Sequence, residues 1–196
     1  LGFNETGQVL YFKSGDKLDQ MNFKTDTFSN NSSIHKPGEM EIPGLQPNDQ
    51  VCFFSDSFAL ISSNRPGGLG GYDIYFTQKK QQGWTPFENI GIAINTPYDE
   101  VSPYLAYDGR TLLFSSNSTK SSGGFDIFLA RFSDKDLSWE IPMNVGWPIN
   151  SAGDDQHFVM NKNRLGGIFS SNRKSGVGGY DIYIAYFKNA WVPQSE

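Results

Sequence analysis

The chain carries the stretch SSNRPGGLGGYDIY at residues 62–75, which looks at first like a glycine-rich loop that cradles a phosphate. Nearly the same stretch recurs as SSNSTKSSGGFDIF at 115–128 and as SSNRKSGVGGYDIY at 170–183. A ligand loop is normally present once, whereas a stretch that returns at a fixed period is typical of a repeat architecture. The recurrence therefore predicts that this stretch builds the fold.

The repeated positions keep a constant spacing. In every copy an asparagine precedes an aspartate by nine residues, and the copies start 53 and 55 residues apart. Between them lies a pair of glycines, which supply backbone conformations closed to other residues. The motif consists of Asn64, Gly70, Gly71 and Asp73, of Asn117, Gly123, Gly124 and Asp126, and of Asn172, Gly178, Gly179 and Asp181.

Other features repeat at the same period. NIGIAIN at 89–95 matches NVGWPIN at 144–150. The N-terminal stretch is a fainter first copy, in which Asp19 precedes Asp73 by 54 residues, Gly15 replaces the asparagine and the glycine pair is absent. The repeats divide the chain into four units, at residues 1–47, 48–97, 98–152 and 153–196.

The best-defined unit predicts an all-β fold. Asp108 and Gly109 tolerate the positive φ of a hairpin turn, and apolar residues flank them on both sides. Apolar and polar residues alternate only partly, which indicates sheets covered on both faces. We expect strands at 100–107, 110–116 and 125–132 and a weaker edge strand between 139 and 145. Repeated four-stranded antiparallel units of about 50 residues predict a β-propeller with one blade per repeat.

Composition agrees with this fold class and excludes others. Aromatic residues make up 15% of the 196 residues, glycines number 21, and charged residues reach only 19%. This mixture of strand-forming and turn-forming residues argues against a disordered chain or a helical bundle. The net charge is −5 and no basic cluster occurs, so we expect no nucleic-acid groove.

Cysteine usage and hydropathy narrow the function further. The single cysteine, Cys52, excludes an intrachain disulfide and lies in the apolar run QVCFFS, so we expect a buried structural thiol. No segment approaches the roughly 18 apolar residues of a membrane-spanning helix. The chain starts without methionine or a signal sequence, which suggests a mature or excised piece of a longer protein.

The repeat resembles a known family. The string SSNR-x-GG-x-GGYDIY, with an aspartate-glycine turn before it and N-x-G-x-x-IN between copies, is similar to the WD40-like repeats of TolB-type propellers. It looks closest to the propeller region of large periplasmic Bacteroidota proteins that carry an OmpA-like peptidoglycan-binding domain, some of them in outer-membrane secretion and gliding machineries. The resemblance covers residues 1–192 and implies a periplasmic, outer-membrane-associated protein.

The resemblance also implies more blades than this chain contains. TolB-type propellers usually have about six blades, whereas four repeats occur here. If the ring closes at four, Leu1–Phe3 and the C-terminal strand share blade positions. If it does not close, the remaining blades lie outside this piece, because open sheet edges invite aggregation. We favour the second reading.

The motif residues predict structure rather than catalysis. A phosphate loop needs a lysine and a helix N-terminus after its glycines, and these glycines run into a strand. We expect the asparagines to fold back onto the backbone of their own loop and the aspartates to accept backbone N–H groups. Arg65 and Arg173 are candidate partners of those aspartates, although Ser118 stands at the same position of the third repeat.

Acidic pairs before each first strand are the candidate binding site. A propeller's first strand lines its central channel, so these residues would converge at the channel mouth and hold a cation such as Ca²⁺ or a basic peptide. A solvated acidic rim that caps strand ends is the alternative. The candidates are Asp49 with Gln50, Asp99 with Glu100, and Asp154 with Asp155, followed by His157; the Ca²⁺ ligands would be Asp99, Glu100, Asp154 and Asp155.

No catalytic signature occurs in the sequence, so we expect a binding or scaffolding module and no enzyme. The favoured partners are envelope proteins, with Arg65, Arg173 and Trp147 as candidate contacts. A glycan- or peptidoglycan-binding module is the second possibility, and Trp147 is the residue to mutate for it. A propeller glycoside hydrolase is the third, for which Glu100→Gln or Asp155→Asn would abolish turnover.

Overall fold

The computed structural model describes residues 2–3, 9–13, 22–27 and 38–189, and these residues form only strands, turns and loops. The strands pair antiparallel throughout. The expected all-β class is therefore confirmed. Gly15 and Asp19, which belong to the fainter first copy, lie outside the described residues.

Within the described part of the chain, the strands group into four sheets, each from one continuous stretch of sequence. The first sheet contains β1 (Gly2–Phe3), β2 (Val9–Lys13), β3 (Asn22–Thr27) and β4 (Gly38–Glu41). The second contains β5 (Gln50–Ser55), β6 (Phe58–Ser63), β7 (Asp73–Lys80), β8 (Gly83–Trp84) and β9 (Glu88–Asn89). The third contains β10 (Glu100–Leu105), β11 (Thr111–Ser116), β12 (Asp126–Ser133), β13 (Ser138–Trp139) and β14 (Met143–Asn144). The fourth contains β15 (Asp155–Met160), β16 (Gly166–Ser171) and β17 (Asp181–Tyr186).

The strands expected for the third unit are present within one or two residues. The turn between β10 and β11 places Gly109 at a φ of +66°, and the Asp108 carboxylate accepts the N–H groups of Arg110 and Thr111. The weak edge strand is divided in two, because β13 pairs with the end of β12 and β14 pairs with its middle. Glu140, Ile141 and Pro142 lie between the two pieces, outside any strand.

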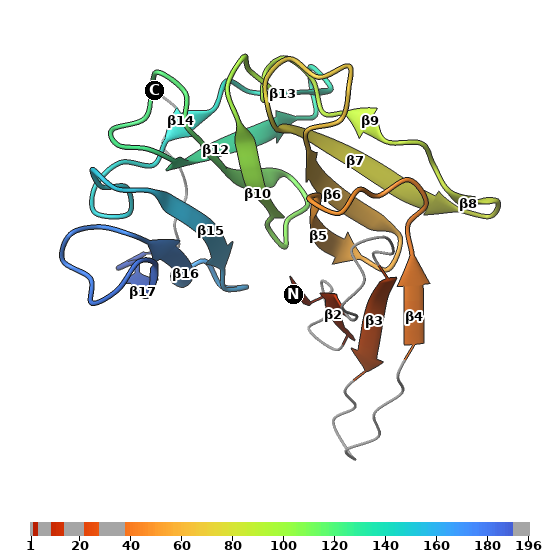
Figure 1. Cartoon of the computed structure of the whole chain (residues 1–196), viewed down its shortest axis with the longest axis horizontal. Helices are drawn as coiled ribbons and strands as arrows, with labels where there is room; N and C mark the ends of the chain where they lie inside the picture. The colour runs from red at the N-terminus through yellow and green to blue at the C-terminus, as the bar shows by residue number, and fades with distance from the viewer. Residues whose placement is uncertain (1, 4–8, 14–21, 28–37, 190–196) are drawn as a thin grey trace.

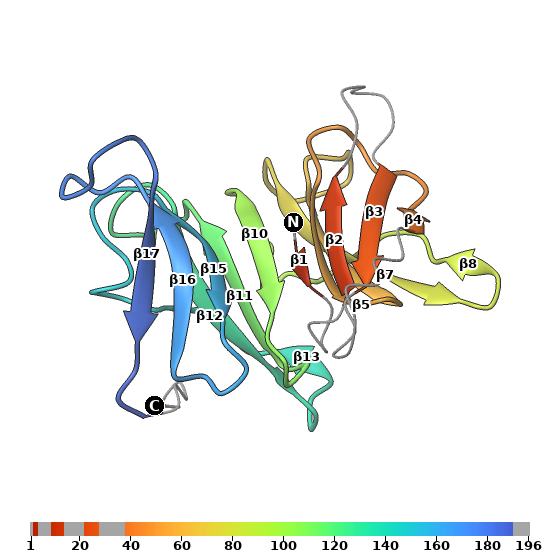
Figure 2. The same cartoon turned by 90° about the horizontal axis from the view of Figure 1, so that it is seen from below.

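The sheets follow one another around an arc (Figures 1 and 2). The second, third and fourth sheets pack against one another in succession, and the first sheet contacts the second through β1 and β5. Their first strands, β1, β5, β10 and β15, lie on the inner side, where neighbouring first strands contact one another. This agrees with the expectation that the first strand of each unit lines the inside. Among the described residues no strand pairing joins the first sheet to the fourth.

Apolar side chains fill the spaces between successive sheets. Leu112 and Phe114 of β11 pack toward the second sheet, in a core with Leu60 and Ile74. Leu113 of the same strand packs toward the fourth sheet. All six residues of β11 are therefore buried, which explains why the sequence alternates so incompletely here.

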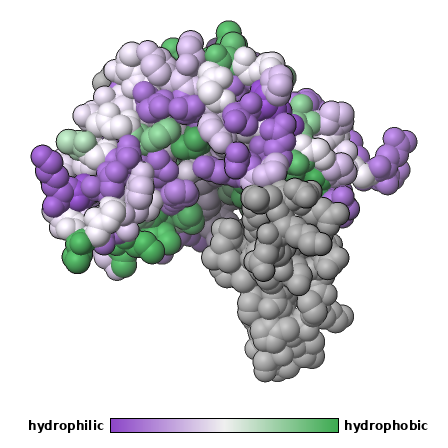
Figure 3. All heavy atoms as spheres, viewed as in Figure 1, coloured by the Kyte–Doolittle hydropathy of each residue, from purple (hydrophilic) through white to green (hydrophobic). Residues whose placement is uncertain are grey.

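The fourth sheet has one open face. Val159, Ile168 and Ile184 lie opposite one another across β15, β16 and β17, and they are 43%, 47% and 61% exposed. The equivalent of Ile168 in the third sheet, Leu113, is fully buried beneath the fourth sheet. Figure 3 shows hydrophobic side chains gathered over β16 and β17, at the lower left.

Candidate functional site

The strand register corrects the alignment of the acidic residues. Gln50, Val101 and Gln156 pair with the equivalent serines Ser62, Ser115 and Ser170. The carboxylates one residue before these three positions are therefore equivalent: they belong to Asp49, Glu100 and Asp155. Asp49 matches Glu100 and Asp155, and not Asp99 and Asp154 as the sequence suggested. All three residues are buried, at 8%, 0% and 0% exposure.

Asp99 and Asp154 join successive sheets. Asp99 accepts the N–H of Tyr72, in the glycine-rich loop of the preceding sheet, at 2.8 Å, and the Asn117 amide at 2.9 Å. Asn117 also accepts the N–H of Asp99 at 2.9 Å. Asp154 makes the same contacts with Phe125 and Asn172. We call this arrangement the inter-sheet latch.

The latch corrects the expected role of the asparagines. Asn117 and Asn172 bind the aspartate that precedes the first strand of their own sheet, and not the backbone of their own loop. A reciprocal pair of hydrogen bonds satisfies both the amide and the aspartate backbone, which a fold-back onto the loop would leave unpaired. In the second sheet Asn48 stands where Asp99 and Asp154 stand, and Asn64 is exposed.

The repeated aspartates hold the glycine-rich loop, as predicted. Asp73 accepts the N–H groups of Leu69 and Gly70, and Asp181 accepts those of Val177 and Gly178. Asp126 accepts the N–H of Ser122 at 2.7 Å. Backbone N–H donors offset part of the cost of burying a carboxylate, which accounts for an aspartate inside an aromatic strand.

The glycine pairs allow close approach of the next sheet. The backbone conformation expected from the sequence is not the reason for them, because no glycine of the three pairs has a positive φ. A Cβ on Gly70 would overlap the carbonyl oxygen of Tyr98, and one on Gly124 would overlap the Asp154 carboxylate. Around Gly178 and Gly179 a Cβ would meet no atom within 4 Å. The first two loops are therefore pressed against a following sheet, whereas the third loop is open.

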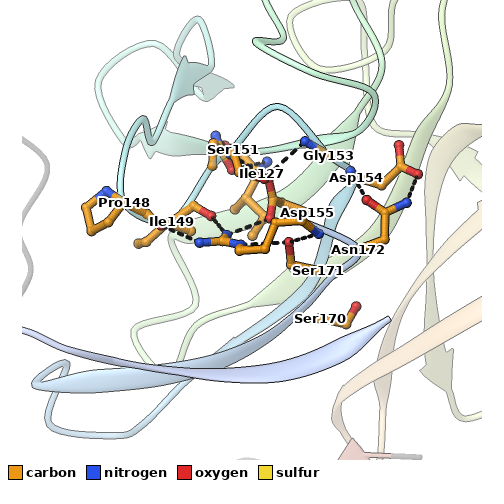
Figure 4. Close-up of polar contacts among 12 residues, drawn as sticks. Ile127, Pro148, Ile149, Ser151, Gly153, Asp154, Asp155, Ser170, Ser171 and Asn172 are labelled. Carbon is orange, nitrogen blue, oxygen red and sulfur yellow. Dashed lines mark hydrogen bonds and ion pairs between the residues drawn. The ribbon is translucent and has the colours of Figure 1, made fainter. Parts of the chain in front are cut away.

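The Arg173 side chain lies between the third and fourth sheets, enclosed by polar groups and aromatic rings that we call its box. Its guanidinium donates to Asp155 at 2.7 Å and to the carbonyl oxygens of Pro148 and Ile149, while its Nε donates to Ser171 (Figure 4). It also lies over the ring of Tyr183, with 4.6 Å between its Cζ and the ring centroid, and beside Phe169. The side chains of Arg173 and Asp155 are 11% and 0% exposed, so this ion pair is buried.

Arg65 repeats the arrangement in the second sheet. Its guanidinium donates to Asp49 at 2.9 Å, and its Nε donates to Ser63 at 3.0 Å. It lies 4.0 Å from the ring centroid of Phe87 and 5.2 Å from that of Tyr75. The prediction that Arg65 and Arg173 pair with Asp73 and Asp181 is wrong, because each arginine reaches back to the carboxylate at the start of the first strand.

The third sheet departs from this pattern. Ser118 stands at the position of Arg65 and Arg173, and a pocket of about 390 Å³ opens beside it. Glu100 lines the pocket and accepts the N–H and hydroxyl of Thr96 and the hydroxyl of Ser116. Among the described residues no arginine or lysine forms an ion pair with Glu100. This carboxylate is the candidate functional group of the chain.

Burial raises the pKa of Glu100 above its usual value, and the nearby charge of Asp73 adds to this, against the lowering effect of the Thr96 and Ser116 hydrogen bonds. A buried carboxylate with neutral donors alone is a poor place for a negative charge. A cation placed beside it would lower the pKa of this carboxyl group.

The acidic residues do not converge on one site. Asp99 and Asp154 are held in latches, and Asp155 is paired with Arg173. No group of three or more acidic, histidine or cysteine side chains in the described ranges is placed to hold a metal ion. His157 lies on β15 and contacts the Ser170 hydroxyl, and partial desolvation lowers its pKa.

Two buried asparagines escaped the sequence analysis. Asn95 binds both the N–H and the carbonyl of Ile74, and Asn150 does the same with Ile127, so each amide extends the ladder of its sheet. The repeated stretch N-x-G-x-x-IN, in which each of them is the last residue, was the sequence pattern that could have predicted their role. Trp147, a candidate partner contact, is 80% exposed.

Comparisons with known proteins leave the family open. No family model matches the chain, and no curated protein is significantly similar to it in sequence. No helix in the described ranges is long and apolar enough to cross a bilayer.

Proposed function

We propose that the sheets are blades of a β-propeller and that the chain is a non-enzymatic scaffold that binds protein partners. The inter-sheet latch is the observation that supports this most directly. The same Gly-Gly, Asp and Asn groups join the second sheet to the third and the third to the fourth. One joint used repeatedly rotates each sheet by a similar angle, which generates a radial array.

The open face of the fourth sheet supports the propeller further. Its apolar residues are equivalent to those that the third sheet buries, and a Cβ on Gly178 or Gly179 would meet no atom within 4 Å. A further sheet of the same repeat would bury this face and latch onto this loop. We propose that such a sheet completes the ring, so that the intact propeller has more than four blades.

The use of the carboxylates favours a scaffold over a hydrolase. A glycosidase needs two carboxylates that face one substrate, one of them as acid and the other as base or nucleophile. Asp155 is already paired with Arg173, and Asp99 and Asp154 are already hydrogen-bonded in the inter-sheet latches. Rigid sheets with exposed loops are instead suited to recognition.

The setting that we propose is the periplasm, in association with the outer membrane, and it comes from the resemblance of the repeat. A test is to immobilise the chain and an Ile92→Ala, Trp147→Ala variant, whose exposed residues occupy equivalent loop positions. The two are then incubated with envelope extract. Envelope proteins held by the wild type and lost by the variant would support the scaffold. Equal profiles for both would contradict it.

A glycan-binding module is the second candidate, because Trp147 presents its indole to solvent at 80% exposure. Sugar rings stack on such faces through CH and ring contacts. Retention of the wild type on purified peptidoglycan, together with loss of retention in Trp147→Ala, would favour this candidate over the protein scaffold.

A further inference from the structure

The pocket beside Ser118 is built from the same parts as the box around Arg173. The carboxylate of Asp155 corresponds to that of Glu100, and Ser171 corresponds to Ser116. Pro148 and Ile149, whose carbonyl oxygens accept from Arg173, correspond to Ala93 and Ile94 in the repeated N-x-G-x-x-IN stretch. All four counterparts, Glu100, Ser116, Ala93 and Ile94, line the pocket.

The aromatic wall is present as well. Phe169 and Tyr183 stack at 5.6 Å between ring centroids with 23° between their planes, and the Arg173 guanidinium lies against them. Their counterparts Phe114 and Phe128 stack at 5.9 Å, also with 23° between planes, and line the pocket. Guanidinium is weakly hydrated, planar and suited to aromatic faces and carboxylates at once.

We infer that this pocket binds the guanidinium group of an arginine that the chain does not itself supply. The repeat furnishes an arginine at residues 65 and 173, and at residue 118 the serine leaves the box open. The incoming guanidinium pairs with Glu100, stacks against Phe114 and Phe128, and donates to the backbone carbonyl oxygens of Ala93 and Ile94, whose counterparts accept from Arg173 in the fourth sheet.

The rim identifies the source of the arginine as a protein segment. Ile92 and Ile141 line the pocket and are 83% and 79% exposed, and Tyr98 is 40% exposed. An apolar collar around one buried charge is the arrangement in which an arginine serves as an interface anchor. This part of the inference rests on the proposed function, whereas the pocket itself does not.

Lys120 is the cationic residue of the pocket lining. It lines the pocket and is exposed, and its backbone carbonyl accepts from Asn144. An ammonium group does not stack on aromatic faces or bridge a carboxylate and two carbonyls as a planar guanidinium does. We therefore expect Lys120→Ala to change guanidinium binding less than twofold.

The test is titration with Nα-acetyl-arginine amide, followed by amide NMR shifts of residues 114–118, with Nα-acetyl-citrulline amide as the uncharged isostere. We expect saturable shifts with the arginine compound and none with citrulline. Glu100→Gln and Ser118→Arg should each weaken binding at least tenfold, the first by removing the charge and the second by filling the box. Ser118→Met, which adds bulk without charge, separates the effect of filling from that of pairing.

Equal shifts with both compounds, or binding that survives Glu100→Gln, would overturn the inference. Binding that appears only in Lys120→Ala would also overturn it, because Lys120 would then be the resident cation. The outcome is distinguishable from that of the proposed function. If the pocket binds the arginine compound but no envelope protein is retained, the inference about the pocket stands and the proposed scaffold function is refuted. If envelope proteins are retained but the pocket does not bind the arginine compound, the scaffold function stands and the inference about the pocket is refuted.

Discussion

Asn117 and Asp99 hold one another through two hydrogen bonds of 2.9 Å, one from the backbone N–H of Asp99 and one from the amide of Asn117. The second oxygen of Asp99 reaches the N–H of Tyr72 in the preceding sheet. A pair of residues 18 positions apart thus fastens one sheet to another.

Asn117→Asp is expected to destabilise the chain. The new carboxylate lies against Asp99, so it replaces a hydrogen-bond donor by a like charge. Hydrogen bonds to charged groups contribute roughly 1.5–3 kcal/mol, and we expect a loss of about that size in the free energy of unfolding. Urea denaturation measures it. Asn64→Asp is the matched control, since Asn64 is exposed and Asn48 stands at the position of Asp99; a loss as large as that of Asn117→Asp would refute the latch.

Arg173→Met is expected to cost about 3–5 kcal/mol of unfolding free energy, because it leaves the Asp155 carboxylate buried without a cation. The aliphatic part of the side chain is retained, so the loss reports on the guanidinium group, including its hydrogen bonds to Pro148, Ile149 and Ser171. Arg110→Met is the control: Arg110 pairs with Asp134 at the surface, where the two side chains are 52% and 64% exposed. Such pairs contribute at most about 1 kcal/mol. Comparable losses in the two variants would show that the box around Arg173 does not isolate its ion pair from water.

Glu100→Gln is expected to change how stability depends on pH. The pKa of Glu100 is raised in the folded chain, so its neutral form is the one that folding favours. Its contribution is complete below the ordinary value of 4.5 and is lost as pH rises through the folded pKa. Unfolding free energies of both proteins between pH 4 and pH 7 should therefore diverge in favour of Glu100→Gln. A difference that stays constant with pH would mean that Glu100 titrates normally.

Much of the fold followed from the repeat. The repeat period, the constant loop length and the Asp108-Gly109 turn can all be read directly from the sequence. They therefore predicted the strands of the third unit and the all-β class. The loop-holding role of Asp73 and its counterparts followed from the cost of an unpaired buried charge.

The candidate site could not be predicted in the same way. Pairing Asp49 with Glu100 and Asp155 depends on strand register. The hairpin that follows the carboxylate is two residues shorter in the second sheet than in the third and fourth, which conceals this equivalence in the sequence. Arg173 reaches a carboxylate 18 residues earlier, and the choice between Asp155 and Asp181 is made by packing between sheets. The serine at position 118 could be read from the sequence. That it leaves a pocket open follows only from the structure, where Arg65 and Arg173 fill the equivalent positions of the second and fourth sheets.

The central claim is that the repeated glycine loop is a joint between sheets, and Gly124→Ala tests it against Gly179→Ala. The two glycines occupy the same place in the repeat, but a methyl group on Gly124 overlaps Asp154 and one on Gly179 meets open space. For the 196-residue chain we predict that Gly124→Ala lowers the unfolding free energy by several kcal/mol or prevents folding, and that Gly179→Ala changes it by less than about 0.5 kcal/mol. Equal effects of the two substitutions would contradict the account.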